Sequence, residues 1–82
     1  MKKEVKELLV NMVNTWNVFN PQKAVNVHFD DNEFNPKCWA LDVALEGVVG
    51  SDFIGFLLPV IQANNCIWFL NAYNNKVILH IQ

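Results

Sequence analysis

Four side chains near residue 30 form the densest group in the sequence that could do chemistry. They are His28, Asp30, Asp31 and Glu33. Several oxygen ligands close together suit a hard divalent cation. The spacing does not fit an EF-hand loop, because Phe34 stands where a ligand belongs and no glycine follows. We therefore interpret the segment as a solvated acidic turn, and we expect neither a metal ion nor any other cofactor.

The histidines and cysteines are the next candidates for chemistry. His28 and His80 would share one sheet face, but two imidazoles without a third ligand are a weak metal signal. Cys38 would need His28 beside it to act as a nucleophile, and no helix N-terminus or adjacent base activates its thiol. Cys38 and Cys66 are too few for a disulfide framework or a zinc set. We expect a cytoplasmic protein with reduced thiols and no catalytic residue.

A glycine-rich motif, Gly47-Val48-Val49-Gly50, has the spacing of the loop that clamps nucleic acid in KH domains. A KH loop joins two helices, whereas this one would join a strand to a helix and carries no basic residue. The motif is also a poor phosphate cradle, because the Asp52 carboxylate would repel an anion at the helix start.

The charge composition narrows the class of partner. The net charge is −2, and the chain has six lysines but no arginine, the residue that makes bidentate contacts to phosphate and guanine. We expect no nucleic acid partner. The longest apolar run, residues 53–61, is about half as long as a bilayer span, and the N-terminal residues are charged. We therefore expect neither a membrane-spanning helix nor a secretory leader.

Hydrophobic periodicity predicts two helices, one before the first strand and one between the two pairs of strands. Apolar residues recur at helical spacing from Val5 to Trp16, which predicts a helix over residues 2–17. Ser51 is a candidate N-cap for a second helix, which runs to about Ala63 and is kinked or divided by Pro59.

Alternating apolar residues predict four strands, over residues 24–29, 38–46, 66–73 and 76–82. A polar connection over residues 30–36 would separate the first two. The resulting α-β-β-α-β-β order predicts a single α+β domain over residues 1–82. Its four-stranded, mostly antiparallel sheet has both helices on one face. The order of the strands within the sheet is not readable from the sequence.

The Asn74-Asn75 pair predicts the register of the last hairpin, because asparagine tolerates the positive φ of a two-residue turn. Tyr73 is then opposite Lys76, and Phe69 is opposite His80. The apolar residues expected under the helices are Val25, Val27, Phe29, Trp39, Leu41, Val43, Leu45, Trp68, Leu70, Ala72, Val77, Leu79 and Ile81.

The second face of the sheet carries the best functional signal. Its first hairpin is polar, but its last hairpin would expose the interface candidates Ile67, Phe69, Tyr73, Ile78 and His80. Such an apolar and aromatic patch exceeds what a monomer normally exposes. Either a loop or the N-terminus covers it, or it is an interface. We expect a homodimer, another protein partner, or both. Edge pairing through strand 76–82 would serve equally well.

These observations favour a small, non-catalytic protein–protein interaction module. The alternative is a small-molecule-binding or enzymatic domain, with a pocket between the sheet and the second helix near Trp39, Trp68, Asp42 and Cys38. Single-stranded nucleic acid binding on exposed aromatics is a distant third hypothesis, because the basic residues it needs are missing.

Overall fold

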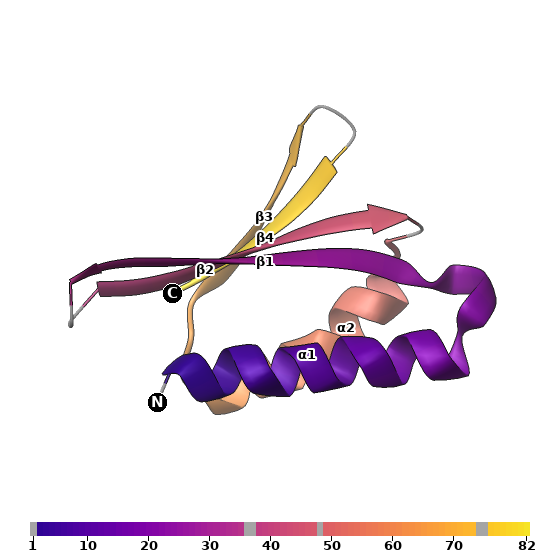
Figure 1. Ribbon diagram of the computed structural model, residues 1–82, viewed down its shortest axis with the longest axis horizontal. Coiled ribbons are helices and arrows are strands. Elements are labelled where there is room, and N and C mark those ends of the chain that lie inside the picture. The colour runs from indigo at the N-terminus through magenta and orange to yellow at the C-terminus, as the bar shows by residue number, and fades with distance from the viewer. Residues whose placement is uncertain (1, 36–37, 48, 74–75) are drawn as a thin grey trace.

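Two helices cover one face of a twisted four-stranded sheet (Figure 1). The computed structural model describes residues 2–35, 38–47, 49–73 and 76–82. The elements in chain order are α1 (Lys2–Phe19), the 3-10 turn η1 (Pro21–Lys23), β1 (Val25–Asn35), β2 (Cys38–Gly47), α2 (Ser51–Ala63), β3 (Trp68–Tyr73) and β4 (Lys76–Ile81). The α+β fold class and the element order predicted from the sequence are therefore confirmed.

Helix α1 buries the apolar stripe predicted for it. Val5, Leu9, Val13 and Trp16 are all at most 9% exposed, since residues three or four apart share one face of a helix. The helix runs to Phe19, two residues further than predicted. Asn20 then ends it: its backbone N–H and its side-chain amide both donate to the Trp16 carbonyl, at 2.8 and 3.0 Å.

Helix α2 starts one residue earlier than the sequence suggested, with Gly50 rather than Ser51 at the N-cap. The Asp52 carboxylate accepts a hydrogen bond from the Phe53 N–H at 2.8 Å. Pro59 does not divide the helix, which is continuous from Ser51 to Ala63. Pro59 and Gly55 are both exposed, so water can bond the Gly55 carbonyl that proline leaves without a donor.

The strand order is β1-β2-β4-β3, and all three pairings are antiparallel. The register predicted for the last hairpin is confirmed, from Tyr73 opposite Lys76 to Trp68 opposite Ile81. Strand β1 is longer than predicted, because residues 30–33 and 35 stay paired with β2 instead of forming a polar connection. Polar residues there end the apolar alternation of the sequence, but the pairing continues past them with a register shift between residues 33 and 35.

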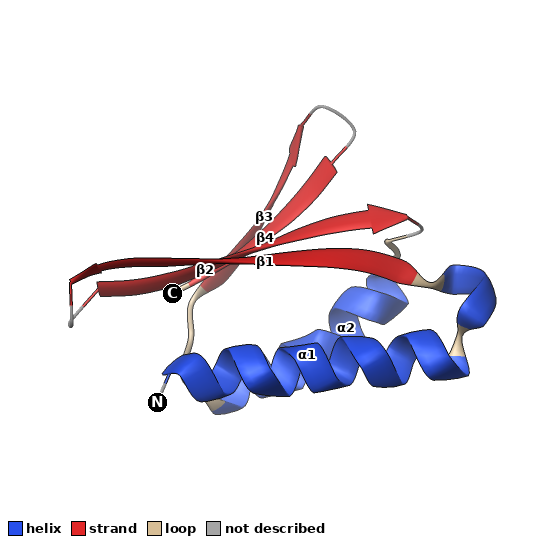
Figure 2. Ribbon diagram, in the orientation of Figure 1, coloured by secondary structure: helices blue, strands red, loops and turns tan. Residues whose placement is uncertain are grey.

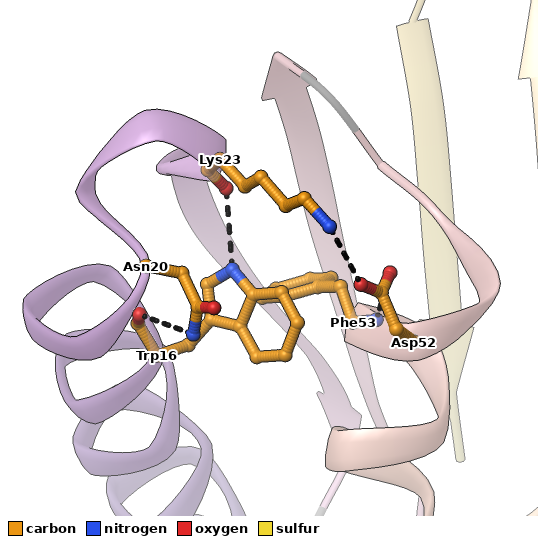
Figure 3. A network of polar contacts seen from close by, with 5 residues as sticks. All are labelled: Trp16, Asn20, Lys23, Asp52 and Phe53. Atoms are coloured by element: carbon orange, nitrogen blue, oxygen red, sulfur yellow. Dashed lines mark hydrogen bonds and ion pairs between the residues drawn. The ribbon is translucent and has the colours of Figure 1, made fainter.

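An aromatic cluster joins the end of α1 to the start of α2 (Figure 3). The Trp16 ring meets Phe53 edge-on, with ring centroids 5.3 Å apart, and its indole N–H donates to the Lys23 carbonyl at 3.2 Å. Lys23 in turn pairs with Asp52 at 3.6 Å. The cluster closes one end of a core whose buried members on the sheet are Val25, Leu41, Val43, Leu45, Leu79 and Ile81.

The helical layer is narrower than the sheet, which corrects one expectation. Leu70 and Ala72 lie on the face of the sheet that the helices cover, as predicted, but both side chains are exposed, Leu70 by 41%. Figure 2 shows the end of β3 and the start of β4 standing away from both helices. The twist of the sheet carries this corner beyond the cover that α2 provides.

Candidate interaction surface

An apolar patch lies on the second face of the β3–β4 hairpin. It consists of Ile67, Phe69 and Ile78, of which Ile67 is 63% exposed, Phe69 is 46% exposed and Ile78 is half-buried. Ile67, which directly precedes β3, and Phe69 are two residues apart in extended backbone and lie on the same face, and Phe69 is opposite His80 on β4. The register places Tyr73 on this face too, although its side chain lies outside the described part of the structure.

His80 borders the patch, and its ring contacts the side chains of Phe69, Asp42 and Gln82. Its ring stacks on Phe69, with centroids 4.7 Å apart and an interplanar angle of 27°. Nδ1 donates to Oδ1 of Asp42 at 2.5 Å, and Nε2 donates to Oε1 of Gln82 at 2.9 Å. The Gln82 hydrogen bond, followed by the hydrogen bond and charge of Asp42, raises the pKa of His80 against the opposing effect of desolvation. The site therefore favours an imidazolium.

The raised pKa of His80 predicts that stability falls as the pH rises. The folded chain holds this proton more tightly than the unfolded chain, so the stabilisation is complete below the unfolded value of about 6.5 and is lost as the pH passes the folded pKa. We expect denaturant unfolding above about pH 6.5 to show this loss, and the His80→Gln variant to show a flatter profile. Equal slopes in the two proteins would contradict the role given to His80.

The outer edge of β3 presents backbone groups to solvent. Ile67 and Gln82 exchange two backbone hydrogen bonds, of 2.7 and 2.9 Å. Because antiparallel ladders alternate, residues 67, 69 and 71 direct their N–H and C=O groups toward β4. Trp68, Leu70 and Ala72 direct theirs away from it. Strand β3 is an edge strand, so no further strand receives these groups.

The opposite edge of the sheet, on β1, is protected. The Asn17 side chain lies against Val25 as a neighbouring strand would: Val25 N–H donates to Oδ1 at 2.9 Å, and Nδ2 donates to the Val25 carbonyl at 3.0 Å. Further along, β1 carries Asp30 and Asp31 and shifts register between residues 33 and 35. A capping side chain, charges and a bulge all discourage edge pairing. In contrast, β3 has the sequence WFLNAY and carries no charge.

The strand order overturns the expectation that strand 76–82 offers a free edge. Strand β4 lies between β2 and β3 and is paired on both sides. The predicted hairpin was correct, but its other strand, β3, is the one at the edge. The long-range pairing of β2 with β4 decides this, and no local pattern in the sequence encodes it.

A groove separates the β3–β4 hairpin from the first half of α2. Its volume is about 520 Å³, and its lining residues are Val49, Gly50, Ser51, Ile54, Gly55, Leu58, Leu70, Ala72 and Val77. The groove lies between the sheet and the second helix, where the pocket was predicted, but neither Asp42 nor Trp68 lines it. Asp42 points to the other face, toward His80. The side chains of Trp39 and Cys38 lie outside the described part of the structure. The lining side chains include one hydroxyl and no carboxylate, imidazole or thiol.

The candidates for chemistry whose side chains the structure describes do not converge, while the side chains of Glu33 and Cys38 lie outside the described part. His28 is opposite Ala44, and β2 separates it from His80. Asp31 points to the helical face, where Lys6 binds it at 3.1 Å, while Asp30 and His28 lie on the other face. Ala44 and Cys38 are six residues apart on β2, which puts His28 about 20 Å from Cys38. Among the residues described, no group of three or more potential ligands is placed to hold a metal ion.

The remaining sequence candidates have structural roles. Cys66 is a free, buried thiol. Gly47 has a φ of +116°, and a side chain there would meet the Ala24 carbonyl oxygen at 3.0 Å, so this position requires glycine for the path of the chain. The Asp52 carboxylate occupies the start of α2, where a phosphate group would have to bind.

Comparisons of sequence and of structure give no relative from which a function can be carried over. No protein family, curated protein or solved structure matches this chain. None of the described helices has both the length and the apolar character needed to span a membrane. The function is therefore inferred from the surface around β3.

Proposed function

We propose that this chain is a small, non-catalytic cytoplasmic module that binds protein, either itself or another chain, through the β3 side of its sheet. The observation that carries the proposal is the coincidence of the exposed apolar patch with the uncharged edge of β3. Each feature alone is costly in a monomer, because apolar side chains and unpaired strand edges both promote association. Their occurrence on the same strand favours one binding surface.

The absence of converging reactive groups supports a binding role over catalysis. Within the described residues, the polar cluster around His80 is built from Asp42, Gln82 and the Phe69 ring. Both ring nitrogens of His80 already bond to Asp42 and Gln82. The cluster therefore holds the side chains at the border of the patch in place. A general base or nucleophile would instead face a cavity that admits substrate.

The proposal is tested by placing a charge in the patch. We expect Phe69→Glu to remain folded, because this side chain is half in water already, and to lose association. Size-exclusion chromatography with light scattering, at several concentrations, measures the mass. Phe19→Glu is the matched control, since Phe19 is 78% exposed at the far end of α1. If Phe69→Glu and the unmodified chain have the same mass at every concentration, self-association through the patch is ruled out.

The groove supports a second candidate, the binding of a small apolar molecule. Its volume of about 520 Å³ falls within the range of ordinary ligand sites, and its walls are largely aliphatic. A ligand that fills it would raise the melting temperature in a thermal-shift screen. Leu58→Glu would abolish that rise, while Phe69→Glu, on the other face of the sheet, would keep it.

A further inference from the structure

We propose that β3 pairs with β3 of a second copy of this chain, antiparallel and about a two-fold axis at Leu70. This inference rests on the proposed function and names the partner at the same surface. The result would be one continuous eight-stranded sheet, twice the four strands of a single chain.

The backbone pattern of β3 fixes where the axis lies. The residues whose backbone groups face outward are Trp68, Leu70 and Ala72, so Leu70 has one such residue on either side. An axis at Leu70 sets it opposite the partner's Leu70, and sets Trp68 opposite the partner's Ala72. Every outward N–H and C=O group of the strand then finds an acceptor or a donor. An axis at Phe69 would leave the groups of Ala72 beyond the paired region.

Charge opposes a second copy less at the β3 edge than at the β1 edge. The chain has a net charge of −2, so two copies repel each other. Strand β3 has no ionisable side chain, and an antiparallel pair of β3 strands brings no like charges into register. Strand β1 carries Asp30 and Asp31, and two β1 edges would bring carboxylates together.

The side chains of β3 complement one another in this register. Leu70 and Ala72 line the groove beside α2, so the partner strand would extend the groove wall and exclude water from it. The small side chain of Ala72 is opposite the partner's Trp68, which leaves room for the larger indole. On the second face, Phe69 is opposite Asn71 of the partner subunit. A single occupant thereby covers the strand edge, the groove and the β3 side of the apolar patch.

The first test removes a backbone donor at the edge. Ala72→Pro deletes an outward N–H and places a ring at the edge, but leaves the hydrogen bonds from β3 to β4 intact. We expect this variant to have the 9.4 kDa mass of a single chain at concentrations where the unmodified chain has twice that mass. Ala72→Ser, which keeps the N–H, should remain dimeric. Far-ultraviolet circular dichroism confirms that each variant is folded.

The second test reads the register. Hydrogen-bonded antiparallel pairs have Cα atoms about 5.5 Å apart, a separation that a disulfide spans. We expect Leu70→Cys, in a Cys38→Ser background and at low concentration, to form a covalent dimer that dithiothreitol reverses. Asn71→Cys is the matched control: it is also exposed, but it is opposite the partner's Phe69 and should stay uncrosslinked.

The outcomes separate this inference from the proposed function. A Leu70→Cys crosslink together with a monomeric Ala72→Pro variant supports edge pairing. A dimer that survives Ala72→Pro, yields no Leu70→Cys crosslink and dissociates in Phe69→Glu overturns edge pairing while leaving the patch as the binding surface. An unmodified chain of 9.4 kDa at every concentration overturns the inference of a second copy.

Discussion

Replacing Trp16 with alanine is expected to lower the free energy of unfolding by about 3–5 kcal/mol. The side chain is 9% exposed and packs against Phe53 and Phe56, with ring centroids 5.3 and 5.5 Å away. Its removal leaves a cavity between the two helices, where both rings lose their contacts. A domain of this size is stabilised by about 4–12 kcal/mol in total, so the variant should be close to unfolding at room temperature.

Chemical denaturation measures this loss, and Trp16→Phe shows how much of it comes from packing. Phenylalanine keeps an aromatic ring against Phe53 and gives up the hydrogen bond from the indole to the Lys23 carbonyl, which contributes about 1 kcal/mol. We expect Trp16→Phe to be clearly more stable than Trp16→Ala. Equal losses in the two variants would mean that the hydrogen bond to Lys23, and not packing against Phe53 and Phe56, accounts for the stabilisation by Trp16.

Replacing Leu79 with alanine is expected to cost about 2–5 kcal/mol. Leu79 is fully buried on β4, where it is paired with Val43 on one side and Leu70 on the other. Truncation therefore leaves a cavity in the packed core, which the surrounding structure fills only in part. The fall in unfolding free energy from urea titrations is the relevant measurement.

Leu70→Ala is the matched control, because Leu70 is directly opposite Leu79 in the same pair of strands but is 41% exposed at the edge. Measured at a concentration where the chain is monomeric, it should cost less than about 1 kcal/mol. Because both positions hold leucine, the difference between the two losses of stability reports the effect of burial alone. If the two variants lost the same stability in the monomer, α2 would have to cover the β3 edge, which would contradict the exposed surface described above.

Local patterns in the sequence were sufficient for much of the fold. The spacing of Val5, Leu9, Val13 and Trp16 predicts both α1 and its buried face. The position of Asn74-Asn75 predicts the register of β3 and β4, although the turn itself lies outside the described residues. Turn chemistry and periodicity act over a few residues, and a single sequence therefore carries them in readable form.

The remaining features depend on contacts between distant segments. The placement of β4 beside β2 decides which strand is the edge, and it joins Asp42 to His80 across 38 positions of sequence. The exposure of Leu70 depends on how far α2 reaches across a twisted sheet. Strand β1 also continues beyond Phe29, where the apolar alternation of the sequence ends, because it is paired with β2. The capping of Val25 by the Asn17 side chain appears only in three dimensions.

Amide hydrogen exchange along β3 tests the central claim most directly. In a single chain, the N–H groups of Phe69 and Asn71 are bonded to β4, while those of Leu70 and Ala72 face solvent. Under dimeric conditions we expect all four amides to exchange slowly, and Leu70 and Ala72 to become fast on dilution. Fast exchange at Leu70 and Ala72 at every concentration, alternating with slow exchange at Phe69 and Asn71, would contradict pairing at the β3 edge.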